Sequence, residues 1–62
     1  MQFHIETMTC GGCARSVTKA IHLVDPLAEV KADPATHTVD VTTTAPRERL
    51  AAVLADAGFA PA

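Results

Sequence analysis

Apolar and polar residues alternate over the first seven positions of the chain. Phe3, Ile5 and Thr7 share one side, while Gln2, His4 and Glu6 share the other. This period of two predicts a half-buried strand over residues 2–7. A turn is expected to follow over residues 8–12.

The hydrophobic period changes from two residues to that of a helix at Cys13. Four apolar residues then recur at spacings that place them on one helical face: Ala14, Val17, Ile21 and Val24. The polar residues between them occupy the other face. The Asp25-Pro26 pair ends the predicted helix, because a residue before proline avoids the α-helical region.

Two further strands are predicted to form a hairpin. The first covers residues 27–32, with Val30 as its principal core residue, and the second covers residues 37–43, with Val39 and Val41 pointing inward. The intervening residues 33–36, Asp-Pro-Ala-Thr, are typical of a turn, since proline presets the backbone for it.

A second helix is expected after the hairpin, with Thr44 or Ala45 as its cap and Pro46 at its first position. Its apolar face is the set Leu50, Val53, Leu54 and Ala57. Gly58 stands where a left-handed residue commonly ends a helix. Residues 59–62 are predicted to form a short last strand, which Pro61 confines to a sheet edge.

The predicted order is therefore βαββαβ. Two amphipathic helices need one sheet face to cover them, so we expect an α+β, ferredoxin-like two-layer sandwich. Its sheet would have four antiparallel strands, and both helices would lie on one face. With 62 residues and no repeat or linker, the chain is expected to be a single domain over residues 1–62.

Composition limits the kinds of function. The chain has no Trp or Tyr and only two Phe, and so small a core leaves little room for an enclosed substrate pocket, so we expect a surface function rather than an enzyme. A net charge of −2 argues against a nucleic-acid partner. No apolar run could span a membrane, and no signal peptide is recognisable, which predicts a cytoplasmic protein with reduced thiols.

The candidate chemistry is the pair Cys10 and Cys13, separated by Gly11 and Gly12. Cys13 should lie in the first helical turn, where the helix dipole favours the thiolate. The two glycines are expected to keep the space between the sulfurs clear and to allow unusual backbone angles. Two convergent thiolates within reach of solvent are the predicted result.

Three chemistries could use such a pair. Dithiol redox exchange is one, although the chain is short for a thioredoxin fold. Structural zinc is another, but it needs four ligands and only two cysteines exist. A soft cation such as Cu(I), which accepts two thiolates, fits best and leaves room for a third sulfur from another protein.

The run Met8-Thr9-Cys10-Gly11-Gly12-Cys13-Ala14 resembles the MxCxxC loop of the heavy-metal-associated domain family. That family includes bacterial copper chaperones and domains of copper-exporting P-type ATPases. The resemblance covers nearly the whole chain and implies the same βαββαβ fold. It identifies Cys10 and Cys13 as metal ligands and Met8 as a methionine that packs inward under the loop.

Other positions carry less direct implications. The resemblance places Phe59 near the site as a shield for the metal loop, at a position often occupied by Tyr in bacterial members. Thr9 stands where zinc-type members often have an acid, which favours copper. Thr7 replaces the usual glycine before the methionine, so loop mobility is expected to differ.

The resemblance implies a Cu(I) chaperone that passes its metal by thiolate exchange to the metal-binding domain of a copper-transporting P-type ATPase. It would contact the transporter peripherally, without membrane insertion, as a monomer or a metal-bridged dimer. Two alternatives stay open: a domain excised from such an ATPase or from mercuric reductase, and a thiol oxidoreductase.

The remaining polar residues have ordinary interpretations. His4, His22 and His37 are expected to face solvent, and His22 is favourable near a helix C-terminus when charged. Arg15 and Lys19 could steer a partner, but such charges are more commonly a solvated helix face.

Overall fold

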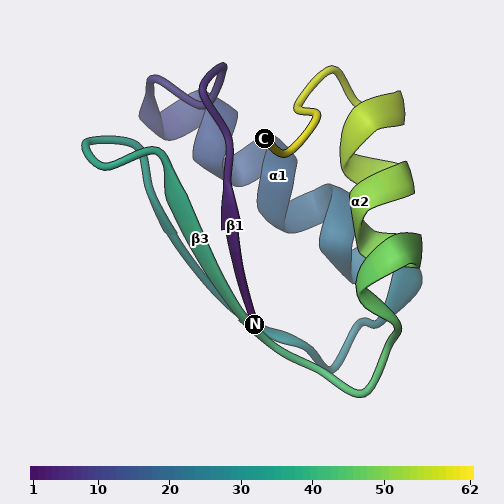
Figure 1. Cartoon of the computed structure of the whole chain (residues 1–62). Coiled ribbons are helices and arrows are strands. Elements are labelled where there is room, and N and C mark those ends of the chain that lie inside the picture. Colours follow the sequence, from purple (N-terminus) through teal and green to yellow (C-terminus); the bar gives the residue numbers. More distant parts are fainter.

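Both helices lie on the same face of a three-stranded sheet (Figure 1). The computed structural model describes residues 1–62. Its elements are β1 (Gln2–His4), α1 (Gly11–Val24), β2 (Glu29–Asp33), β3 (Thr38–Thr42) and α2 (Arg47–Asp56). The α+β class and the two layers are confirmed. Neither α1 nor α2 combines the length and the hydropathy that a membrane-spanning helix needs.

The sheet has the order β1-β3-β2, and both pairings are antiparallel. In the β2–β3 hairpin, Val30 pairs with Val41 and Ala32 with Val39. Phe3 of β1 pairs with Val39 from the other side. The predicted hairpin is therefore confirmed, and the central strand is the last of the three in the chain.

The predicted fourth strand is not formed. Residues 59–62 are irregular, and Pro61 has no N–H to donate to a neighbouring strand. The outer edge of β1 instead receives two separate donors: the Ala62 amide bonds the His4 carbonyl at 2.7 Å, and Arg47 Nη1 bonds the Gln2 carbonyl at 2.8 Å. A tail residue and an arginine side chain thus occupy acceptors that a fourth strand would use.

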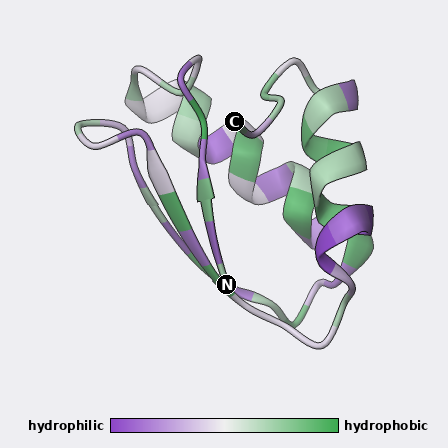
Figure 2. Cartoon of the chain, viewed as in Figure 1, coloured by the Kyte–Doolittle hydropathy of each residue, from purple (hydrophilic) through white to green (hydrophobic).

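Eleven apolar residues form the core between the sheet and the helices. They are Phe3, Ile5, Met8, Val17, Ala20, Ile21, Ala28, Val39, Val41, Leu50 and Leu54. Apolar and polar segments alternate along both helices (Figure 2), and the buried helix residues are all apolar. The assignment of Val30 as a principal core residue is wrong: Val30 is half-buried and Ala28 is buried in its place. Val30 belongs to the edge strand β2, which only one helix, α1, contacts.

The first strand is shorter than predicted. It ends at His4, and the chain then turns, with the Met8 amide donating to the Ile5 carbonyl at 3.2 Å. Ile5 remains buried, but Thr7 is exposed, so the predicted extension of the strand to residue 7 is wrong. The turn breaks the alternation before Thr7 is reached.

The ends of the second helix follow the local sequence closely. Pro46 is the N-cap residue rather than the first helical residue, a difference of one position. At the other end Gly58 has φ 89°, and the amides of Gly58 and Phe59 bond the carbonyls of Ala55 and Leu54 at 3.0 and 2.8 Å. This is the left-handed C-terminal motif expected at Gly58.

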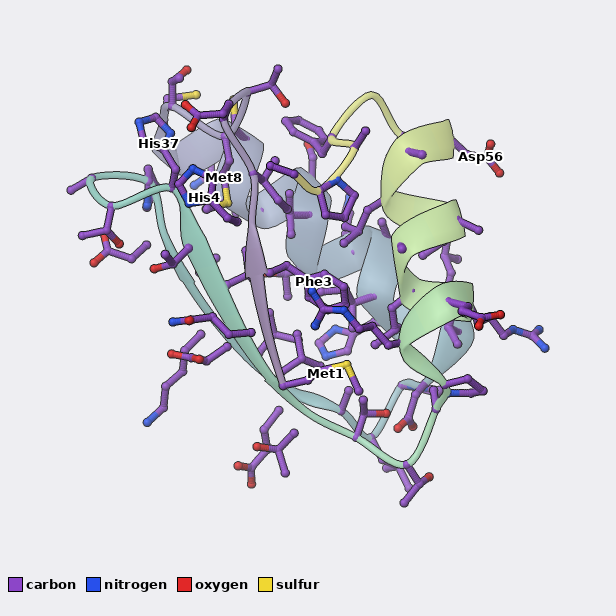
Figure 3. All side chains as sticks on the ribbon, viewed as in Figure 1. Met1, Phe3, His4, Met8, His37 and Asp56 are labelled. Carbon is purple, nitrogen blue, oxygen red and sulfur yellow. The ribbon has the colours of Figure 1, made fainter.

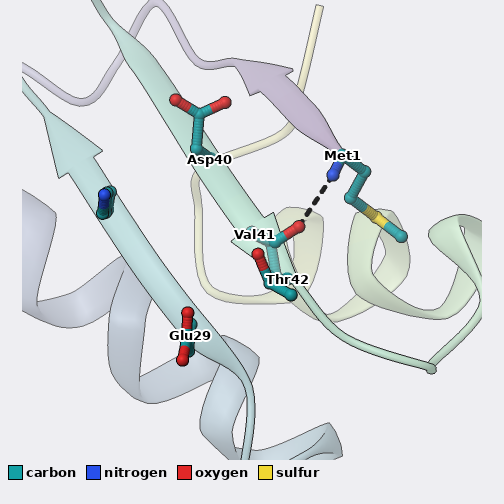
Figure 4. A pocket seen from close by; sticks show the side chains of 6 residues that line it. Met1, Glu29, Asp40, Val41 and Thr42 are labelled. Carbon is teal, nitrogen blue, oxygen red and sulfur yellow. Dashed lines mark hydrogen bonds between the residues drawn. The ribbon is translucent and has the colours of Figure 1, made fainter.

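A shallow hollow lies on the opposite, solvent-facing side of the sheet (Figure 4). Charged side chains of β2 and β3, Glu29, Lys31 and Asp40, line it beside Met1. The Met1 ammonium donates to the Val41 carbonyl at 2.7 Å, which extends the pairing of β1 with β3. The N-terminus is thereby held at the end of the sheet.

Candidate metal centre

Cys10 and Cys13 come together at the first turn of α1. Cys10 is the N-cap residue, with an extended backbone (φ −147°, ψ 170°), and its sulfur accepts a hydrogen bond from the Cys13 amide at 3.4 Å. The helix begins two residues earlier than predicted, at Gly11, and brings the two Sγ atoms to 3.1 Å. Both thiols are free; Cys10 is exposed and Cys13 half-buried.

The surroundings of Cys13 favour its thiolate. The hydrogen bond from Cys10 is the largest cause that lowers the pKa of Cys13, and hydrogen bonds from Thr9 lower it further. Partial burial opposes these effects without cancelling them. The unpaired amides at the start of α1 add a positive potential of the same sense. These surroundings therefore favour the thiolate of Cys13, the form of cysteine that binds metals.

The two glycines act differently from the prediction. Neither has a left-handed backbone, since Gly58 is the only glycine with positive φ. A Cβ atom at Gly11 would meet nothing within 4 Å, and one at Gly12 would make an ordinary contact of 3.8 Å with Cys10 Sγ. The expectations of unusual backbone angles and of relieved crowding are thus wrong. Both glycines leave bare, exposed backbone beside the sulfurs.

Met8 is fully buried in the core, directly before the metal loop, which we define as residues 9–13. This is the inward orientation that the resemblance implied. Its side chain anchors the chain under the loop, because moving a buried thioether into water is costly.

Phe59 is half-buried and packs against the core. Its neighbour Gly58 accepts a 3.4 Å hydrogen bond from the Thr7 hydroxyl, which ties the end of α2 to the segment before Met8. The tie brings the Gly58 backbone beside Thr7, two residues before the loop. Shielding of the metal by Phe59 stays a prediction.

His37 is the residue near the site that sequence reasoning missed. It is half-buried rather than solvent-facing, and its Nδ1 lies 3.0 Å from the Met8 carbonyl oxygen (Figure 3). His22 is also half-buried, with Nε2 2.9 Å from the Ala28 carbonyl, whereas His4 is exposed and pairs with Glu6 at 2.6 Å. Nothing local in the sequence marks the contact from His37 to Met8, because 29 positions separate them.

The candidate site brings together two cysteine thiols. No group of three or more His, Cys, Asp or Glu side chains is placed to hold one metal ion. A closed structural zinc centre uses four protein ligands, whereas the chain has two cysteines. Two sulfurs with an open side suit a soft cation that accepts a low coordination number.

The family model of the heavy-metal-associated domain matches residues 2–60, and the chain belongs to this family. A gold binding protein of known structure is 56% identical over 98% of this chain and 94% of its own, with a TM-score of 0.95. The copper chaperone Atx1 from Synechocystis PCC6803 is 32% identical over 100% and 98%, with a TM-score of 0.96.

A third solved structure, protein Atu1203 from Agrobacterium tumefaciens, is 40% identical over 100% of this chain and 97% of its own, with a TM-score of 0.88. The comparison with curated proteins gave no match. The family, together with the adjacent thiols of Cys10 and Cys13, defines the chain as a metal-binding domain.

Proposed function

We propose that this protein is a Cu(I) chaperone that carries one ion between the sulfurs of Cys10 and Cys13. The observation that carries the proposal is the pair of free thiols, 3.1 Å apart, at the exposed start of α1. Thiolates select Cu(I) over hard ions, and two suffice to hold it. The likeness to the copper chaperone Atx1, over the whole chain, supports the same cargo.

Metal entry requires the sulfurs to separate. A metal–sulfur bond is about 2.3 Å long, so two sulfurs on opposite sides of one ion lie up to about 4.6 Å apart. The Sγ atoms of Cys10 and Cys13 are only 3.1 Å apart. Cys10 is the residue free to move, because it is exposed and lies outside the helix proper.

Transfer would proceed by ligand exchange. A thiolate of a partner attacks the bound ion from its open side, a three-coordinate intermediate forms, and one sulfur of this chain leaves. The partner we propose is the metal-binding domain of a copper-transporting P-type ATPase, contacted at the membrane surface in a reducing cytoplasm. The chain acts as a carrier in this scheme, with no catalytic turnover.

Au(I) is a second candidate cargo. The gold binding protein shares 56% of its residues with this chain, a higher identity than that of the copper chaperone Atx1. Gold in this oxidation state is also a soft monovalent cation that two thiolates can hold. The two candidates differ in the ion selected and share the ligands Cys10 and Cys13.

The test is a competition titration of the reduced, oxygen-free protein. Cu(I) and Au(I) are added against chelators of known affinity, and Zn(II) and Hg(II) in parallel. We expect one Cu(I) per chain, strong preference over zinc, and loss of binding in Cys10→Ser and Cys13→Ser. Ala52→Ser is the matched control, because it places the same residue on the exposed face of α2.

The other outcomes separate the alternatives. Tighter binding of Au(I) than of Cu(I) would support the gold candidate, and tight Hg(II) binding alone would support a mercury-delivery domain. If no soft metal binds, dithiol turnover and a reduction potential near cellular poise would identify an oxidoreductase. Sedimentation with and without Cu(I) tests the expected monomer against a metal-bridged dimer.

A further inference from the structure

His37 adopts a backbone conformation that most residues avoid. Its φ is 57°, in the left-handed region, at the end of the turn between β2 and β3. The turn is closed by the His37 amide, which donates to the Pro34 carbonyl at 3.3 Å, and by the Asp33 carboxylate, which accepts from the Ala35 amide at 3.0 Å. Glycine or asparagine would adopt this conformation more readily.

His37 contacts both ends of the turn that leads from β1 to the metal loop. Its carbonyl accepts from the Ile5 amide at 2.8 Å, and its Nδ1 lies 3.0 Å from the Met8 carbonyl. Ile5 and Met8 are themselves joined by the 3.2 Å bond that closes the turn. Figure 3 shows His37 and His4 next to Met8 at this end of the molecule.

The contact with the Met8 carbonyl shows which nitrogen of the His37 ring carries a proton. A carbonyl oxygen only accepts, so His37 Nδ1 must carry the hydrogen, in the neutral ring as in the charged one. The nearby ring of His4 lies 6.2 Å away, centroid to centroid, and is paired with Glu6. Neither of these groups competes for the Met8 carbonyl in the structure.

We infer that His37 is a positioning residue of the metal loop: it fixes the Met8 carbonyl and so limits how far the following backbone of Thr9 and Cys10 can move. Burial in the core fixes the side chain of Met8, and the hydrogen bond from the His37 ring fixes its carbonyl. For the metal-bound protein the inference rests on the proposed function. In the metal-bound protein, a loop fixed by His37 slows the separation of the two sulfurs and therefore the release of the ion.

Two substitutions distinguish the contribution of the His37 ring from that of its backbone conformation. His37→Asn tolerates positive φ and places an amide N–H donor on the same branch of the side chain as Nδ1. His37→Gly accepts the backbone conformation without strain and removes the donor. Both keep the His37 carbonyl that the Ile5 amide uses, so the Ile5 amide is an internal control.

The first measurement uses the metal-free protein. Nitrogen NMR of the imidazole should find the neutral wild-type ring protonated at Nδ1. Hydrogen exchange at the amides of Met8 and Cys13 should be about three- to tenfold faster in His37→Gly, the effect of losing one hydrogen bond, and close to wild type in His37→Asn. Exchange at Ile5 should not change.

The second measurement is the rate at which an excess chelator removes Cu(I). We expect the chelator to remove Cu(I) faster from His37→Gly than from the wild type, and at the wild-type rate from His37→Asn. A neutral ring protonated at Nε2, or loop exchange equal in wild type and His37→Gly, would overturn the inference. Failure of the wild type to bind Cu(I) would refute the proposed function alone, because the metal-free measurements decide the role of His37.

Discussion

The Thr43 hydroxyl donates a 2.6 Å hydrogen bond to the Asp25 carboxylate and so joins the end of β3 to the end of α1. The Leu27 amide donates to the other carboxylate oxygen at 3.0 Å. These two bonds, the Thr43 bond first, lower the pKa of Asp25, and the charge of His22 contributes in the same direction. The ionised carboxylate is therefore favoured in the folded state.

We expect Thr43→Val to destabilise the protein at neutral pH and much less in acid. A lowered folded pKa contributes stability that is present above the unfolded value, about 3.9, and is lost as the pH falls through the folded value. The gap between the urea midpoints of wild type and variant should narrow as the pH falls below that range. A residual gap should remain, because the variant also loses the hydrogen bond that the Ala45 amide donates to the Thr43 hydroxyl at 3.1 Å. Thr44→Val, at an exposed neighbour, is the control. An equal gap at both pH values would contradict the assignment.

Cys10→Ala should raise the pKa of Cys13 toward its ordinary value, because the hydrogen bond from Cys10 is the largest cause of its lowering. The ultraviolet absorbance of the thiolate, followed against pH, measures this directly. The folded wild type should also gain stability as the pH rises from the folded pKa of Cys13 to the unfolded value, about 8.5. An unchanged Cys13 titration in Cys10→Ala would refute the coupling.

Met8→Ala should lower the free energy of unfolding by about 2–5 kcal/mol, because it opens a cavity at a fully buried position. Met8→Leu, which keeps the volume, should cost less than about 1.5 kcal/mol. Both variants should still bind one Cu(I) if Met8 supports the loop without ligating the metal. Chemical unfolding and metal titration of the same samples provide the measurement; loss of binding in Met8→Leu would identify Met8 as a ligand.

Gly58→Ala and Gly11→Ala should have opposite effects. Gly58 has φ 89°, where an L-residue costs about 1–2 kcal/mol, so alanine there should lower the unfolding free energy. A Cβ atom at Gly11 meets nothing within 4 Å, so alanine there should stabilise the protein by about 0.4–1 kcal/mol, because it restricts the unfolded chain. Thermal unfolding of the two single variants compares them directly, and destabilisation by Gly11→Ala would contradict the geometry.

Local sequence patterns determined most of the elements and the position of the two thiols of the candidate site. The period of two around Phe3 and the helical period from Ala14 to Val24 report which face of each element is apolar, and that face must be covered. Cys10 and Cys13 converge because their separation of three places them within one turn of the helix start. Gly58 ends α2 for an equally local reason, its freedom to adopt positive φ.

Only the tertiary structure decided which elements contact each other and how far their residues are buried. The edge position of β2 leaves Val30 half-buried, and the side chain of Arg47 with the Ala62 amide takes the place of the expected fourth strand. The bond from His37 to Met8 joins residues 29 positions apart. A periodic pattern cannot anticipate such contacts, because it records the exposure of one element and carries no information on the direction or distance of its neighbours.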